Sequence, residues 1–221
     1  MNTITLTALA AITASSAFAD VASFTETFES GANNWLMGSF VDPIFNATGA
    51  LDDSAYISST ADLNSAGPFG LSVFRGEDNF DASGDAFVGD YLVSGINRLT
   101  FDFRHDADID LGVALRVAGP NNFPGMGIEL PGFVAGGEWV TLSFDLDFNN
   151  PLLTLEGAPT IEFFNDVMTA VGNIQVSIDR PDGLTTPLVV NFDLDNVSIT
   201  PAPSAMALLA FGGLITTRRR R

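Results

Sequence analysis

Three aspartates at alternating positions, Asp106, Asp108 and Asp110, form the most compact set of potential metal ligands in the sequence. A helix-flanked calcium loop that begins with this spacing also needs glycine at its sixth position and an acidic ligand at its twelfth. Leu111 and Val117 stand at those two positions here. The segment is therefore interpreted as an exposed acidic turn and not as a calcium loop.

The sequence carries no motif that would activate a nucleophile for catalysis. The chain has one histidine, His105, and no cysteine, which excludes thiol chemistry, disulfide bonds and a histidine-rich transition-metal site. No Gly-x-Ser-x-Gly segment supplies an activated serine. We expect His105 to be a solvated turn residue. Glycoside hydrolysis needs two carboxylates across a cleft, but among 27 acidic residues the sequence marks no particular pair. We therefore expect no catalytic residues.

Four aromatic residues, Trp35, Tyr56, Tyr91 and Trp139, are candidates for stacking against a sugar ring, because an aromatic face packs well against an apolar C–H surface. Trp139 begins an alternating segment and is expected as readily at an edge of the core. Trp35 follows two asparagines in a predicted loop. The sequence therefore makes Trp35 the best candidate for contact with a ligand.

The charge of the chain is strongly acidic, with 27 acidic and 9 basic residues and a formal net charge of −18. Residues 20–200 hold all 27 acids and only five arginines, so this part carries a formal charge of −22. A body this acidic is repelled by phosphate backbones, and we expect no nucleic-acid partner. It either attracts divalent cations or simply stays soluble.

Residues 20–200 are expected to form one all-β domain, because 221 residues support one core of ordinary size. Apolar and polar residues alternate along segments 99–104, 111–117, 140–146 and 190–195, as in antiparallel strands with one buried face. Glycine, proline and asparagine clusters separate them. Many short strands and 19 phenylalanines favour a jelly-roll-like sandwich of two sheets. Segment 41–70 is expected to be irregular.

The ends of this domain carry acidic residues on strand-like segments: residues 24–31 contain Glu26 and Glu29, and residues 191–199 contain Asp193 and Asp195. This arrangement resembles jelly-roll carbohydrate-binding modules and related lectin-like sandwiches. The resemblance implies a structural calcium ion shared by Glu29 and Asp195, with Glu26 and Asp193 as alternates. Carboxylate oxygens are the hard ligands that calcium takes. The alternative is that these acids only alternate outward on amphipathic strands.

The N-terminal end is predicted to be a signal peptide, residues 1–19. An apolar helix-forming run over residues 4–14 precedes Ala17 and Ala19, and small residues at those two positions suit signal peptidase. We expect cleavage before Asp20 and export of the mature chain.

The C-terminal end, residues 201–221, combines three parts: Pro201-Ala202-Pro203-Ser204, a 13-residue apolar helix over 205–217, and the arginines at 218–221. The helix would be about 20 Å long, short of a bilayer core of roughly 30 Å. The arginines are predicted to stay on the cytoplasmic side of the inner membrane. The order of the parts resembles the PEP-CTERM sorting tail that exosortases process, with Ala202 where that motif has glutamate. The resemblance implies transient anchoring and a Gram-negative envelope or biofilm; a plain anchor is the alternative.

The sequence thus predicts a non-catalytic, exported cell-surface or extracellular-matrix protein that binds glycan and is stabilised by calcium. Its expected partners are signal peptidase, an exosortase-like enzyme and an extracellular polysaccharide. Two alternatives remain open: a purely structural envelope or biofilm component, and a secreted polysaccharide-active enzyme. A cleft with two facing carboxylates would favour the enzyme.

Overall fold

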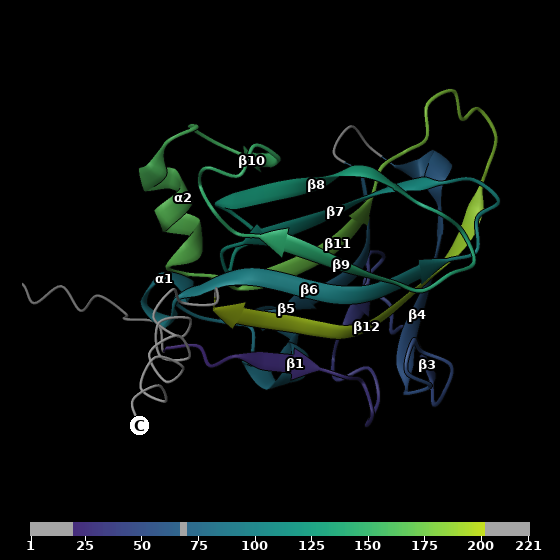
Figure 1. The fold of residues 1–221 in the computed structure, drawn as a ribbon, viewed down its shortest axis with the longest axis horizontal. Helices are drawn as coiled ribbons and strands as arrows, with labels where there is room; N and C mark the ends of the chain where they lie inside the picture. The colour runs from purple at the N-terminus through teal and green to yellow at the C-terminus, as the bar shows by residue number, and fades with distance from the viewer. Residues whose placement is uncertain (1–19, 67–69, 202–221) are drawn as a thin grey trace, which may run out of the picture.

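The computed structural model describes residues 20–66 and 70–201. Within them two six-stranded antiparallel sheets pack against each other, which confirms the predicted all-β sandwich (Figure 1). The predicted signal helix and most of the sorting tail lie outside the described residues. So do the sites predicted at Ala17, Ala19, Ala202, Pro203, Ser204, Arg218, Arg219, Arg220 and Arg221. Pro201 is the last residue of the final strand.

The first sheet contains both the first and the last strand of the described chain. Its order is β3 (Ile44–Asn46), β4 (Tyr56–Asp62), β12 (Val189–Pro201), β6 (Ile96–His105) and β9 (Val140–Asp145), with β1 (Phe24–Glu26) beside β12. Strands β1 and β4 share one edge of β12. β4 pairs with residues 189–194 and β1 with residues 197–199. The sheet therefore places the two predicted acidic segments next to each other.

The second sheet is built mainly from the middle of the chain. Its order is β10 (Leu153–Leu155), β8 (Gly125–Val134), β7 (Leu111–Ala118), β11 (Asn173–Ile178), β5 (Leu71–Glu77) and β2 (Leu36–Met37). Every residue of β11 is buried, in keeping with its position in the interior of the sheet.

The alternating segments 99–104, 111–117, 140–146 and 190–195 fall on β6, β7, β9 and β12, as predicted. The prediction of an irregular segment at 41–70 was wrong, because β3 and β4 lie within it. Four of the seven β4 residues are polar, and the strand is specified by pairing with β12 and not by its own apolar content.

Short helices also interrupt the strands, and alternation alone did not predict them. The α-helices are α1 (Tyr91–Ser94) and α2 (Ile161–Met168), which lie at one end of the sandwich, whereas β3 and β4 lie at the other (Figure 1). The 3-10 helices span Leu63–Ser65, Asp78–Phe80 and Ala82–Asp85. Asp90 and Thr160 cap the two α-helices by accepting from backbone N–H groups in the first turn. Among the described residues, no helix has the length and apolar character needed to cross a membrane.

The core between the sheets is aliphatic and aromatic. Phe101 stacks on Phe144, and Phe103 stacks on Phe192, with ring centroids 5.3 and 6.2 Å apart. All four rings are no more than 1% exposed. These contacts link β6 to β9 and to β12 on the buried face of the first sheet. The contacts thereby fix the register of these strands, and with it the positions of the acidic side chains on the outer face of the same sheet.

Candidate acidic site and ligand pocket

Asp195 is the most unusual of the predicted site residues, since its side chain is outward-facing on β12 and yet 0% exposed. The loop between β3 and β4 covers it, and Oγ of Ser54 donates to Asp195 Oδ2 at 3.0 Å. Asp195 Oδ1 is buried and has no hydrogen-bond partner among the described residues. Burial is the main cause that raises the pKa of Asp195 to about 6, and the negative charges of Asp52 and Asp102 add to it.

The backbone of β12 is irregular directly after Asp195. The register between β12 and β6 shifts between Asp195 and Ser198, and Asn196 has a φ of 51°. Asparagine tolerates this left-handed conformation better than most residues, which explains its use in the bulge. The bulge turns Asn196 Nδ2 toward two carboxylates, those of Asp195 at 3.1 Å and Asp102 at 2.9 Å.

Two acids that the sequence analysis did not single out therefore belong to this site. Asp102 is directly opposite Asp195 on β6, is 6% exposed, and also accepts from Thr141 Oγ1 at 2.5 Å. Asp52 lies in the covering loop, where hydrogen bonds from Ser54 lower the pKa of its carboxyl. Alternation places Asp102 on the same outer face as Asp195, and that was the available signal; no local signal points to Asp52.

The other predicted calcium ligands divide into one that approaches this site and two that do not. Glu29 Oε1 accepts from the backbone N–H of Ala55 at 3.4 Å, next to Ser54. Glu26 instead faces the opposite side of the sheet, where it accepts from the N–H of Phe28 and from Asn33 Nδ2, each at 2.9 Å. Asp193 forms an ion pair with Arg104 at 2.7 Å and accepts from Ser58 Oγ at 2.6 Å.

No three histidine, cysteine, aspartate or glutamate side chains within residues 20–66 and 70–201 are close enough to form a ready-made metal site. The carboxylates alone therefore do not complete the coordination of a metal ion. The buried, unpartnered oxygen of Asp195 beside Asp52 and Ser54 still fits a hard cation, because calcium also accepts hydroxyl, carbonyl and water oxygens.

The prediction that Trp35 contacts a ligand was wrong. Trp35 is 1% exposed and packs edge-on against Phe28 and Phe87, with both centroid distances at 5.8 Å. Its Nε1 donates to Ser83 Oγ at 2.8 Å. The residues on either side turn the chain through positive φ at Asn33 and Asn34, and this turn directs the indole into the core.

The expectation for His105 was also wrong, since it is 1% exposed at the end of β6. Nε2 lies 2.9 Å from the carbonyl oxygen of Val134, and the N–H of Ala107 donates to Nδ1 at 3.3 Å. This geometry fits the tautomer with the proton on Nε2 and gives the residue a structural role. Asp106, Asp108 and Asp110 lie in the following turn and are exposed, as expected.

Tyr56 and Trp139, two of the four aromatic residues considered for sugar stacking, lie on the outer face of the first sheet, where their rings pack against Arg104. The Arg104 guanidinium carbon lies 4.6 Å from the ring centroid of Trp139 and 5.4 Å from that of Tyr56. Trp139 Nε1 donates to the carbonyl of Gly49 at 3.0 Å, which pins the loop above Asp195. Tyr91 is buried. The partly exposed rings of Tyr56 and Trp139 are thus occupied in holding Arg104 and the covering loop.

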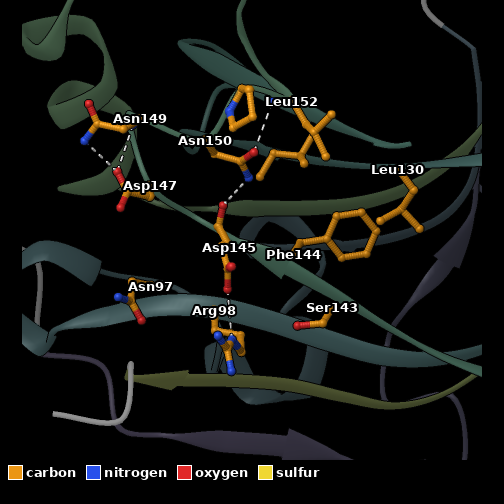
Figure 2. Close-up of a pocket in the computed structure, with 12 residues that line it drawn as sticks. Asn97, Arg98, Leu130, Ser143, Phe144, Asp145, Asp147, Asn149, Asn150 and Leu152 are labelled. Carbon is orange, nitrogen blue, oxygen red and sulfur yellow. Dashed lines mark hydrogen bonds and ion pairs between the residues drawn. The ribbon is translucent and has the colours of Figure 1, made fainter. Parts of the chain in front are cut away.

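An open pocket of about 490 Å³ lies on another side of the sandwich, where β9 of the first sheet faces β8 of the second (Figure 2). The loop between β9 and β10 closes one end. The inner wall is apolar and is formed by Ile128, Leu130, Phe144 and Leu152. The rim is polar and is formed by Asn97, Arg98, Ser143, Asp145, Asp147, Asn149 and Asn150. Sequence reasoning missed this site, because its walls come from segments far apart in the chain.

Hydrogen bonds hold the pocket rim in place. Asp147 Oδ1 accepts from the backbone and side-chain N–H groups of Asn149, at 2.8 and 3.1 Å. Asn150 Nδ2 donates to the Asp145 carbonyl at 2.8 Å, and Asn150 Oδ1 accepts from the N–H of Leu152 at 3.0 Å. These bonds, drawn in Figure 2, order the loop around the cavity.

Searches of known proteins give no family for this chain, since no protein-family model matches and no curated protein matches. Among solved structures, it is similar to Clostridium thermocellum endo-1,4-β-D-xylanase 10B in complex with xylohexaose (15% identity, TM-score 0.48, 80% of this chain and 28% of that chain). It is also similar to the C-terminal family 22 carbohydrate-binding module of that xylanase (13%, 0.43, 81% and 94%) and to the L4b domain of human laminin α-2 (10%, 0.45, 84% and 100%).

The chain thus spans about a quarter of the length of the first of these structures. At these identities and TM-scores no ligand or activity follows from the likeness.

Proposed function

We propose that this protein is a non-catalytic glycan-binding module of an exported envelope or matrix protein. The pocket between β9 and β8 is the observation that carries the proposal. A sugar unit presents apolar C–H faces and polar hydroxyls, and it needs an apolar wall beside fixed donors and acceptors. The pocket offers both, and its volume lies in the usual range for small-ligand sites.

The acids of the pocket support binding over hydrolysis. The residues that line it include two carboxylates, Asp145 and Asp147, which come from one chain segment. Arg98 Nε donates to Asp145 Oδ1 at 3.0 Å. Glycoside hydrolysis needs an acid and a base or nucleophile on opposite sides of the scissile bond. Among the described residues that line the pocket, no further acid lies opposite these two, and we assign no catalytic residue.

Glycan-array screening followed by calorimetry with the purified chain tests this proposal. Ser143 is an exposed pocket residue with no side-chain hydrogen bond among the described residues, so Ser143→Phe should block the pocket without unfolding the protein. Ser39→Phe places the same bulk on an exposed loop residue away from the pocket. We expect only Ser143→Phe to abolish binding. Absence of binding to any polysaccharide would remove the carbohydrate assignment, and release of reducing ends would favour the enzyme alternative.

Calcium is proposed to stabilise the loop over Asp195. The residues that would hold it are Asp195 and Asp52, with Glu29 and Ser54 next to them. A divalent cation would offset the repulsion among Asp52, Asp102 and Asp195 and would supply a partner for Asp195 Oδ1. Glu26 and Asp193 are left out, since each already has other partners.

Export and sorting are proposed from the two ends of the sequence. Signal peptidase would cleave after Ala19, and an exosortase-type enzyme would process the tail that begins at Pro201, after transient anchoring in the inner membrane. Mass spectrometry of the protein from cell fractions tests this. A mature start at Asp20 and loss of the arginines at 218–221 are expected, and an intact C-terminus in the envelope would favour a plain anchor.

A further inference from the structure

Three oxygens on the pocket rim, one each from Asn97, Asp145 and Asp147, accept no hydrogen bond among the described residues. Asn97 Oδ1 is buried and has no partner among the described residues. Arg98 contacts one oxygen of Asp145, and Asn149 uses one oxygen of Asp147. A second oxygen of each carboxylate therefore remains available to a ligand. A buried acceptor without a donor is costly, so a ligand that supplies donors gains more here than one that supplies acceptors.

The net charge of the pocket also favours a ligand that supplies hydrogen-bond donors. Two carboxylates and one guanidinium line it, which leaves a formal charge of −1. The side chains of Arg98 and Asp145 are 39% and 61% exposed, so their ion pair is solvated and open to exchange with a ligand. The surrounding domain carries −22. Its field repels uronate-containing or sulfated polymers and concentrates cationic ones.

We propose that the pocket selects amino-sugar glycans whose amines are free and protonated. This inference rests on the proposed function, because it names the class of glycan that the same pocket takes. The ammonium group donates to Asp145 and Asp147, and the sugar ring packs on Leu130 and Leu152. Asn97 also lines the pocket, and a hydroxyl or amine of the ligand would donate to its amide oxygen. Figure 2 shows Asn97, Asp145 and Asp147 on one side of the view and Phe144 with Leu130 on the other.

A bare divalent cation is the competing occupant of these acids. The apolar wall disfavours it, because four apolar side chains supply no ligand oxygen. An amino sugar can donate from its ammonium group to the carboxylates while its ring packs against the apolar wall.

The test compares two tetrasaccharides of the same linkage, fully deacetylated and fully acetylated glucosamine, by calorimetry with the purified chain at a pH where the free amine is protonated. We expect the deacetylated ligand to bind at least about tenfold more tightly, because the charge-assisted bonds exist only there. Asp147→Asn should reduce that preference several-fold while keeping weak binding to both, since Asp145 remains. Asp108→Asn, the same charge change in the exposed turn at the far end of β6, should leave it intact.

The outcomes separate this inference from the proposed function. Equal affinity for both tetrasaccharides, with both abolished by Ser143→Phe, keeps the glycan pocket and overturns the amine preference. Equal losses in Asp147→Asn and Asp108→Asn show non-specific charge attraction and also overturn it. Displacement of the ligand by stoichiometric calcium, abolished in Asp147→Asn, assigns the acids to a cation. Absence of binding by these and all other glycans overturns the proposed function itself.

Discussion

Asp102 and Asp195 lie directly opposite each other on β6 and β12, and the side-chain amide of Asn196 donates to both. Two carboxylates at such a register position repel each other. The amide between them and the hydroxyl of Ser54 offset part of that repulsion. Within residues 20–66 and 70–201, one oxygen of Asp195 nevertheless has no hydrogen-bond partner, so the repulsion is offset only in part.

The stability of the fold should therefore depend on pH through Asp195. Its folded-state pKa is raised to about 6 from the usual value of 3.8, so between those values the folded state binds a proton that the unfolded chain has lost. The contribution of this group to stability is fully present below the unfolded value and is lost as pH rises through about 6. We expect the loss to be of the order of 2 kcal/mol. Urea unfolding from about pH 4 to about pH 7 measures it.

Asp195→Asn is the variant that isolates this effect. It should flatten the fall in stability over that pH range, whereas Asp108→Asn, an exposed acid without side-chain hydrogen bonds among the described residues, should not. If the free energy of unfolding of Asp195→Asn fell with pH as steeply as that of the unmodified protein, the titrating group would have to be another residue.

Calcium should raise the thermal midpoint through the same site. At a calcium concentration about 100-fold above the dissociation constant, binding adds about 2.7 kcal/mol, or roughly 5–10 °C for a domain of this size. Scanning calorimetry with calcium and with EDTA measures the difference. Asp195→Asn should abolish the shift. Glu26→Gln, which alters an acid on the opposite face of the sheet, should lower both midpoints and keep the shift. Equal midpoints for the unmodified protein would refute the calcium site.

Gly76 should not tolerate a side chain, because a Cβ atom at this position would lie 2.6 Å from Cζ2 of Trp35. We expect Gly76→Ala to lower the free energy of unfolding by about 1–3 kcal/mol through overpacking. Trp35→Phe removes the ring atoms in question, so the double variant should lose less than the sum of the single losses. A double-mutant cycle in urea measures this coupling. Strict additivity would show that the indole does not pack on Gly76.

His105→Ala should destabilise the fold by about 2–4 kcal/mol, since it leaves a cavity and a Val134 carbonyl without its donor. Nitrogen-15 NMR of the imidazole should show the proton on Nε2. Glycan binding should be unaffected in the folded fraction, because His105 lies at the opposite end of β6 from Arg98. A proton on Nδ1, or loss of binding at full stability, would contradict the structural role.

The alternation of apolar and polar residues predicted the two sheets, but only part of the arrangement of the acidic side chains. The alternation in 99–104 and 190–195 specified β6 and β12, because a strand with one buried face must repeat every two residues. The same alternation specified that Asp193 and Asp195 share a face. It could not specify that Arg104 neutralises one while a loop buries the other, because both partners come from distant segments.

The sequence by itself determined the all-β class, the acidic charge, and the absence of thiol and multi-histidine chemistry. Only the tertiary structure decided that Trp35 and His105 belong to the interior, since a turn at Asn33–Asn34 and the carbonyl of Val134 set their directions. It also decided that Asp52 and Asp102 gather around Asp195, and that β9 and β8 enclose a pocket. Burial and convergence are properties of contacts between distant residues, and no local spacing encodes them.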